Sequence, residues 1–347
     1  MSHPGSGRSD SHEWEAPGAF EVAPGVYRIP LPLPGDALRA VNVYALVSGR
    51  EVVLIDSGWA LELAREQLEA ALGTLGFDFA AITRFLITHV HRDHYSQALL
   101  IRRDFGARVS LGAGEEPSLA ALIVRAEEIP TQLAAKLRAA GADELVAALL
   151  RAAAPTDNLT GDLWAPPDEW LRTGDTMPAG DRSLAVIETP GHTAGHVVFH
   201  DAANKVLFSG DHLLPRITPS VGFEMVPARS PLRDYLASLN LTLTLADARL
   251  FPAHGPVIES SRARSAELIA HHQRRLDETE AAVRAGAATG FAVAGVLLWT
   301  GRGRAFADLD IYNQMLAVNE TIAHLDVLAE QGRVERTAEG GVVRYAG

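Results

Sequence analysis

The chain of 347 residues contains no cysteine, which excludes both disulfide bonds and thiolate metal ligands. It also has no apolar run close to the roughly 18 residues that a membrane span needs. Positive charge is scarce, because 31 Lys and Arg stand against 43 Asp and Glu, for a formal net charge of −12. An acidic chain is not attracted to a phosphate backbone. We therefore expect neither a membrane nor a nucleic acid as partner, and any metal must be bound by imidazole and carboxylate groups.

The first 18 residues lack the apolar segment of a signal peptide and are polar and rich in Gly, Ser and Pro. We expect residues 1–18 to form a disordered tail and the protein to be cytoplasmic. With 47% hydrophobic and 21% charged residues, the chain has an ordinary globular composition. Its length suffices for one large α/β domain, which we place at 19–284, and a smaller one at 285–347.

The large domain shows two series of strand patterns separated by helical segments. Short apolar or alternating runs predict strands, and leucines near one face predict a helix at 61–75, while a long polar helix is expected at 258–285. The predicted strands are 25–29, 41–47, 51–56, 82–88 and 107–112 in the first series, and 183–188, 197–200, 205–209 and 249–251 in the second.

Residues 115–165 are rich in Ala and Leu and show no strand pattern. Leucine spacing predicts three short helices, with Pro130 and Gly141 between them. They are centred on 119–123, 133–137 and 145–150. The segment is therefore expected to be a helical insertion in the large domain.

The last part of the chain predicts three helices, at 293–299, 309–315 and 318–331. A hairpin follows, pairing 333–336 with 342–345 around Gly340 and Gly341. This order is that of a winged helix. Residues 285–347 contain five Arg, no Lys and seven Asp or Glu, whereas a DNA-reading helix is usually basic. We therefore interpret the segment as a packing element or the contact of a homodimer.

Four side chains of the types that can bind metals lie within six positions, directly after the strand predicted at 82–88. They are His89, His91, Asp93 and His94. A strand end that leads into a tight loop can direct alternate side chains at one point. Imidazole and carboxylate groups suit zinc, and also iron or manganese. The pattern therefore predicts a metal site.

Three further candidates follow other predicted strands. His192 lies in Thr-Pro-Gly-His-Thr, Asp211 follows Phe-Ser-Gly, and His254 lies in Phe-Pro-Ala-His-Gly. Each strand gives way to a turn with Gly or Pro, and glycine lets the backbone bend close to an ion. Their shared placement after strands favours a common site.

Residues 25–257 resemble the metallo-β-lactamase superfamily. They contain its motifs in the same order: His-x-His-x-Asp-His, then Gly-His, then Gly-Asp, then a final His. The resemblance implies an α/β fold, the αββα sandwich, with two divalent metal ions at one edge of the sheets. It places His89, His91 and His192 on one ion and Asp93, His94 and His254 on the other, with Asp211 bridging. It also implies that Asp56, in Ile-Asp-Ser-Gly, orients a ligand loop.

Two features depart from the common pattern of that superfamily. The usual Gly-Gly after Asp-His is here Tyr95-Ser96-Gln97, so Tyr95 is a candidate catalytic donor to a developing oxyanion, or packs under the loop. His196 and His212 flank ligand candidates and are expected to be structural. The long helix and the C-terminal segment resemble the branch of the superfamily that contains β-lactamase-like protein 2.

The resemblance implies a hydrolase in which a metal-bridging hydroxide, oriented by Asp93, attacks a carbonyl. The expected substrate is a small molecule, a thioester, lactone or ester, and the expected metal is Zn²⁺, with Fe or Mn as alternatives. The insertion at 115–165 is expected to cover the site as an apolar lid. Three alternatives stay open: an RNA or phosphodiester nuclease of the same fold, a regulatory protein that binds nucleic acid through the winged helix, and an oxidoreductase with iron in this pocket.

Overall fold

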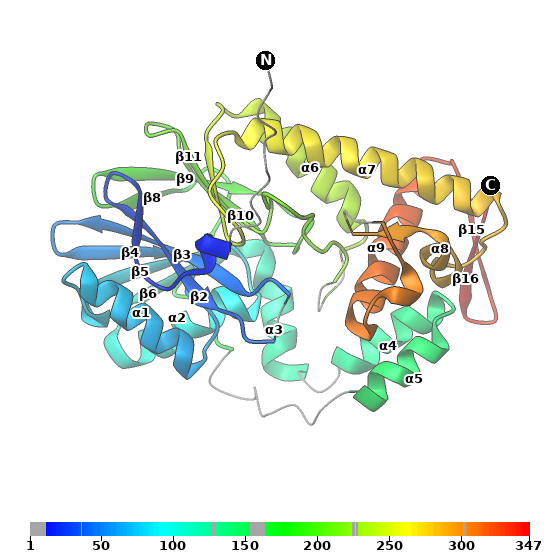
Figure 1. Cartoon of the computed structure of the whole chain (residues 1–347), viewed down its shortest axis with the longest axis horizontal. Coiled ribbons are helices and arrows are strands. Elements are labelled where there is room, and N and C mark those ends of the chain that lie inside the picture. The colour runs from blue at the N-terminus through cyan, green and yellow to red at the C-terminus, as the bar shows by residue number, and fades with distance from the viewer. Residues whose placement is uncertain are drawn as a thin grey trace, which may run out of the picture.

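The computed structural model describes residues 12–35, 37–125, 129–152, 164–223, 226, 228–300 and 303–347. Two sheets face each other, and helices cover their outer faces (Figure 1). The first sheet has the order β1 (Phe20–Ala23), β2 (Val26–Pro32), β3 (Ala40–Ser48), β4 (Glu51–Ile55), β5 (Ile82–Ile87), β6 (Arg108–Gly112), β7 (Glu169–Leu171). The second has the order β12 (Arg249–Pro252), β11 (Val206–Gly210), β10 (Val197–Asp201), β9 (Arg182–Glu188), β8 (Thr176–Ala179).

The layers follow from the alternation of side chains along the strands. In β3, Val41, Val43 and Ala45 pack in the apolar cluster beneath α1 (Glu62–Thr74) and α2 (Arg92–Phe105). The intervening Tyr44 and Leu46 pack in the cluster between the two sheets. On the far side, α6 (Pro231–Thr244) and α7 (Ser261–Arg284) cover the second sheet. The predicted αββα sandwich is therefore confirmed.

The strand pairing explains where the loops lie. Strands β1 to β4 form an antiparallel meander, and β4 to β7 run parallel, with α1 and α2 as crossovers. Parallel strands end at the same edge of a sheet. All the strands predicted from the sequence are present, within a few residues, whereas β1, β7, β8, α2 and α6 were not predicted.

The predicted insertion contains the three expected helices, α3 (Glu116–Arg125), α4 (Ile129–Ala139) and α5 (Asp143–Ala152). Gly141 ends α4 with a φ of 79°, in the left-handed region that favours glycine. Of the predicted insertion, 126–128 and 153–163 lie outside the described residues.

The C-terminal segment differs from the prediction. It contains α8 (Gly290–Val296), β13 (Leu298–Trp299), β14 (Arg304–Ala305), α9 (Ile311–Glu330), β15 (Glu335–Glu339) and β16 (Val342–Ala346). The two helices predicted at 309–315 and 318–331 are wrong, because a single helix, α9, runs through both. No Gly or Pro interrupts it, and the Asp310 side chain caps its start by accepting from Asn313 N. The predicted helix at 293–299 ends at Val296, and the next residues form β13. The hairpin is as predicted, but the winged helix stays a prediction.

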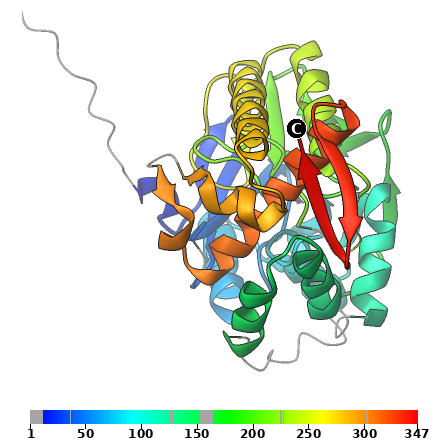
Figure 2. The same ribbon diagram turned by 90° about the vertical axis from the view of Figure 1, so that its right-hand side faces the viewer.

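One apolar cluster joins the insertion to the C-terminal segment. It contains Leu137 of α4, Leu145 of α5, Leu268 of α7 and Val318 and Leu328 of α9. In both ribbon views the C-terminal elements lie between α7 and the insertion helices (Figure 2). The division of the chain at residue 284 therefore stays a prediction, since the two sides share this cluster.

The start of the chain is also partly structured. Residues 1–11 of the predicted tail lie outside the described residues, but His12–Glu15 form a 3-10 helix. The Arg28 guanidinium donates to the Trp14 carbonyl at 2.5 Å. The prediction of disorder is therefore wrong for residues 12–18. Among the helices in the described ranges, none is both long and apolar enough to cross a bilayer.

Candidate metal centre

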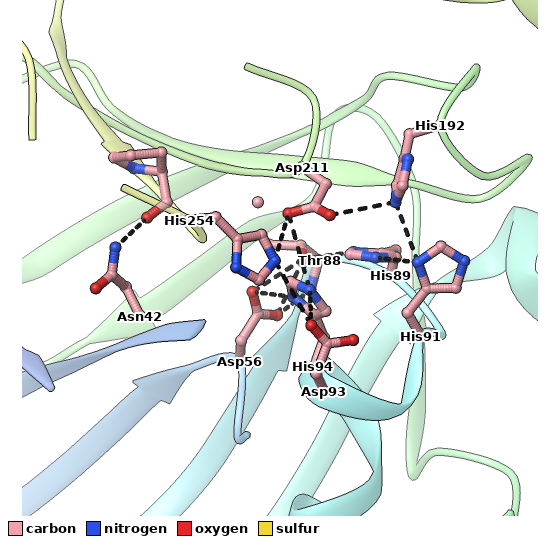
Figure 3. Close-up of polar contacts among 12 residues, drawn as sticks. Asn42, Asp56, Thr88, His89, His91, Asp93, His94, His192, Asp211 and His254 are labelled. Atoms are coloured by element: carbon pink, nitrogen blue, oxygen red, sulfur yellow. Dashed lines mark hydrogen bonds and ion pairs between the residues drawn. The ribbon is translucent and has the colours of Figure 1, made fainter. Parts of the chain in front are cut away.

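The seven predicted ligands lie together at one edge of the sandwich (Figure 3). His89 and His91 follow β5, and Asp93 and His94 lie in the first turn of α2. The other three follow the ends of β9, β11 and β12 and are His192, Asp211 and His254. Their side-chain nitrogens and oxygens form two groups, His89, His91, His192 and Asp211 in one and Asp93, His94 and His254 in the other. These are the two sets that the family resemblance implied.

The distances in the first group suit a small cation. His91 Nδ1 lies 2.9 Å from His89 Nε2 and 3.1 Å from His192 Nε2. Asp211 Oδ2 lies 3.4 Å from His192 Nε2. Ligands about 2.0–2.1 Å from a tetrahedral zinc lie about 3.3–3.4 Å from one another. The four atoms are therefore spaced as ligands of one ion.

The second group has similar spacing, and the other oxygen of Asp211 faces it. Asp93 Oδ2 lies 3.4 Å from His94 Nε2 and 3.5 Å from His254 Nε2. Asp211 Oδ1 lies 3.4 Å from His254 Nε2 and 3.8 Å from His94 Nε2. Each carboxylate oxygen of Asp211 thus faces one group, which is the geometry of a bridging ligand.

Three buried atoms lack a hydrogen-bond partner among the described residues: His94 Nε2 and His254 Nε2 of the second group, and Asp211 Oδ1, which faces them. A buried polar atom without a partner costs about 1–3 kcal/mol. A cation between these three atoms would remove that cost. The residues present therefore fit two divalent metal ions.

Asp56 orients one ligand in each group. Its carboxylate accepts from His94 Nδ1 at 2.9 Å and from the backbone nitrogen and hydroxyl of Thr88 at 2.8 and 3.0 Å. Since the Thr88 hydroxyl donates to Asp56, its oxygen accepts from His89 Nδ1 at 3.0 Å. Both imidazoles are thereby protonated on Nδ1 and present Nε2 to the cluster.

Backbone carbonyls orient two more ligands. His192 Nδ1 donates to Ser220 O at 2.7 Å, and His254 Nδ1 donates to Ala40 O at 2.8 Å. The His254 loop is anchored by Asn42, whose amide donates to Pro252 O and Gly255 O at 2.9 and 2.8 Å. Nε2 of His192 and His254 is therefore available to a metal.

His196 and His212 lie outside both groups. His196 Nδ1 lies 2.9 Å from Thr189 Oγ1, and its Nε2 accepts from the backbone nitrogen of Asp211 at 3.1 Å. His212 pairs with Thr242. A Cβ at Gly210 would lie 2.7 Å from His196 Nε2, so only glycine allows this approach. His196 thus fixes the backbone of Asp211 from the side away from the two groups.

Burial keeps most of the imidazoles neutral. It lowers the pKa of His89 well below its usual value and that of His91 to about 3, with help from neighbouring imidazoles. Burial raises the pKa of Asp211, but the facing His254, His94 and His192 outweigh it, so the net pKa is lowered. For His94, burial is outweighed by Asp93, Asp56 and Asp211, and its pKa is raised. Metal binding at His94 would therefore release a proton.

The structure does not support the oxyanion role predicted for Tyr95. Its side chain is buried beneath the loop, and its hydroxyl donates to the Ala165 carbonyl at 2.6 Å. Its ring lies nearly parallel to that of Trp164. The residue that replaces the usual glycine after Asp-His therefore packs, which was the second interpretation of this position.

Glu115 was not predicted as part of the site, although it braces two ligand loops. Its buried carboxylate accepts from the Thr193 hydroxyl, next to His192, and from the backbone of Val90, between His89 and His91. Burial raises the pKa of Glu115 to about 7. No local sequence pattern marks this residue, because its partners lie 25 and 78 positions away.

A pocket of about 450 Å³ opens onto the cluster. Its floor includes His91, Asp93, His192 and Asp211. Most of its walls come from the insertion, with Ser118, Leu122, Gln132, Leu133, Lys136 and Trp164. The C-terminal segment adds Tyr312 and Asn319, and Phe223 completes the wall. The insertion therefore reaches the site, as predicted, and α9 does so as well.

Comparison with known proteins identifies relatives of this chain. A beta-lactamase-like protein 2 homolog from Caenorhabditis elegans is 25% identical over 243 residues, 70% of this chain and 65% of that protein. An acyl-coenzyme A thioesterase from Gallus gallus is 33% identical over 92 residues, 25% of this chain and 31% of that protein. The crystal structure of a metallo-beta-lactamase family protein from Thermus thermophilus matches with 30% identity and a TM-score of 0.77, covering 94% of this chain and 99% of that one.

The chain thus spans less than two thirds of the length of the Caenorhabditis elegans protein, but nearly all of the Thermus thermophilus protein. The predicted resemblance to the β-lactamase-like protein 2 branch is confirmed, at 25% identity to the Caenorhabditis elegans protein. The model of the metallo-beta-lactamase superfamily matches residues 36–254, which contain all seven ligand candidates. The chain therefore belongs to the metallo-beta-lactamase superfamily.

Proposed function

We infer that this chain is a hydrolase that binds two divalent metal ions in the His/Asp cluster and cleaves a thioester, ester or lactone of a small acyl compound. The observation that carries this inference is Asp211, whose two oxygens face separate ligand groups on the floor of a pocket. Imidazole and carboxylate ligands suit Zn²⁺, and would also accept Fe or Mn. The superfamily and its thioesterase relative support hydrolysis as the reaction class.

When bound, the two ions would supply an acidified water and an electrophile for the substrate oxygen. The protein's own part is to hold this geometry and to move a proton. Asp93 is the carboxylate of the second group and lines the pocket, so we assign it the orientation of the attacking water and the transfer of its proton to the leaving group. The apolar walls exclude other water from the reacting carbonyl.

The pocket walls favour a carbonyl substrate over a nucleic acid. Among the described lining residues, the Arg and Lys side chains are Arg92 and Lys136 alone, and Lys136 Nζ already donates to Gly222 O at 2.6 Å. Leu122, Leu133 and Phe223 provide apolar surface instead. A nuclease groove that follows a phosphate backbone is rich in positive charge. The nuclease alternative is therefore the less favoured one.

The test combines metal analysis with a substrate screen. Protein purified without chelators should contain close to two metal ions per chain. The same protein should hydrolyse acyl thioesters or lactones, and much less readily phosphodiesters or RNA. One ion per chain that added metal does not increase would contradict the two-ion centre. Activity on RNA alone would replace the carbonyl hydrolase with the nuclease.

A further inference from the structure

Arg92 lies between two ligand candidates, His91 and Asp93, and begins α2. Its side chain is exposed and lines the pocket next to the cluster. The fold and the metal site use its neighbours on both sides but give Arg92 itself no role. A cation at this place is notable because most of the other lining residues are uncharged.

Trp59 holds the Arg92 side chain in place. The guanidinium lies over the Trp59 ring, 3.9 Å from its centroid, and Trp59 follows β4 in the segment after Asp56. Such stacking orients the guanidinium and leaves the N–H groups at its edge available. Among the described residues, no carboxylate pairs with Arg92 and no side-chain hydrogen bond from it is found.

Other arginines of the sandwich are used differently. Arg84 pairs with Glu169, and Arg182 with Asp201 at 2.5 Å, so their charge is neutralised within the fold. Arg92 instead keeps a guanidinium at the pocket that is stacked on Trp59 and has no carboxylate partner in the described part of the chain. A guanidinium presents a planar fork of donors that matches a carboxylate or phosphate.

We propose that Arg92 binds an anionic group of the substrate, close to the carbonyl that is cleaved. This rests on the proposed function. Arg92 and Trp59 belong to the sandwich, whereas the apolar walls come from Leu122 of α3, Leu133 of α4 and Tyr312 of α9. The acyl chain therefore lies along Leu122, Leu133 and Tyr312, and the leaving group lies toward Arg92. The substrate class is an acyl thioester or ester whose thiol or alcohol part carries a carboxylate or phosphate.

The test uses the metal-loaded full chain and three hexanoyl-type thioesters. One has a neutral leaving group, N-acetylcysteamine. The second has a carboxylate on the leaving group, 3-mercaptopropionate. The third has a carboxylate on the acyl chain and the neutral thiol. We expect kcat/KM for the second to exceed that for the first by about tenfold, and Arg92→Ala to bring this ratio close to one.

Two further variants sharpen the result. Arg92→Lys keeps the charge but loses the planar fork, so it should retain only part of the preference. Arg108→Ala removes an exposed arginine at the start of β6, at the opposite edge of the sheet from the cluster, and should leave the ratio unchanged. If Arg92→Ala lowers the rate only for the third thioester, the anion belongs to the acyl chain and our assignment of the leaving group is wrong.

Binding without turnover separates this proposal from the proposed function. S-hexyl-3-mercaptopropionate is a thioether that cannot be hydrolysed, and its primary amide is the neutral control. By calorimetry, wild type should bind the acid about tenfold more tightly than the amide, and Arg92→Ala should abolish the difference. Equal binding of acid and amide by wild type, or an unchanged difference in Arg92→Ala, would overturn the role of Arg92 even if thioesters are hydrolysed. If the binding difference is found but no thioester is cleaved, the proposed reaction is wrong and the anion site stands.

Discussion

The two ends of the pocket are built in different ways. At the ligand end, polar contacts depend on one another: Asp56 holds His94 and Thr88, and Thr88 in turn holds His89. At the helical end, α4 and α9 belong to one apolar cluster, and their pocket residues include Leu133 and Tyr312. The first end specifies positions through directional bonds, and the second provides volume and apolar surface.

This difference predicts where substitutions act. A change at the ligand end alters several directed contacts at once, so it should affect metal content and rate. A change in the helical end removes non-directional packing, so it should affect stability or substrate preference. The predictions below test this division, beginning with the largest effect.

The largest effect is expected for Asp211, because one oxygen of its carboxylate faces His192 of the first group and the other faces His254 of the second. Asp211→Ala should lower kcat/KM by about 10³-fold or more, about 4 kcal/mol of barrier, and reduce the metal content. Asp211→Asn should do nearly the same, since a neutral amide bridges two cations poorly. Asp181→Ala, at an exposed turn, is the control. Full activity and two ions per chain in Asp211→Ala would show that Asp211 does not bridge.

The helical end should respond through stability. Leu328 of α9 is fully buried in the cluster that also contains Leu137 and Leu145 of the insertion. Leu328→Ala should lower the free energy of unfolding by about 3 kcal/mol. Because the cluster is shared, hydrogen exchange should increase in α4 and α5 as well as in α9, while α1 stays protected. Faster exchange confined to residues 285–347 would instead indicate an independent domain.

The same two ends explain what the sequence predicted. His89, His91, Asp93 and His94 are close in sequence and follow a strand, so local pattern and family resemblance placed them correctly in one cluster. The strands were predictable because they are short apolar or alternating runs, and in β3 successive side chains pack in two different apolar clusters. These features depend on residues within a few positions of one another.

What the sequence left open or missed depends on distant contacts. The role of Tyr95 was left open between an oxyanion donor and packing under the loop, and the contact that favours packing, from its hydroxyl to the Ala165 carbonyl, spans 70 positions. Glu115 reaches Thr193 only because the chain returns to it after the whole insertion. The break predicted within α9 had no Gly or Pro to cause it, and burial of Val318 and Leu325 keeps the helix continuous.

Glu115 allows a pH-dependent test of the ligand end. Its pKa of about 7 in the folded protein lies above the usual 4.5, because burial disfavours the carboxylate. Its contribution to stability is therefore fully present below pH 4.5 and is lost as the pH rises through 7. Glu115→Gln mimics the protonated form. Its free energy of unfolding relative to wild type should therefore rise by about 2 kcal/mol between pH 5 and pH 8. Urea unfolding of the metal-free proteins at both values measures this.

The neighbouring Glu116 provides the control for that experiment. It is exposed at the start of α3, so Glu116→Gln should follow wild type at both pH values. If the free energy of unfolding of Glu115→Gln differs from that of wild type by the same amount at both pH values, burial does not shift the pKa of Glu115.

The smallest effect is expected on the pocket wall, at two adjacent residues of α3. Leu122 lines the pocket, whereas Ile123 is 46% exposed and does not. Leu122→Asp puts a carboxylate against the acyl chain, so KM for a hexanoyl thioester should rise about tenfold, about 1.4 kcal/mol, with little change for an acetyl thioester that does not reach the wall. Ile123→Asp adds the same charge to the same helix and should change neither KM. If both variants raise KM equally, the effect comes from charge or from helix stability, and the insertion would be a structural support rather than the wall that selects the acyl group.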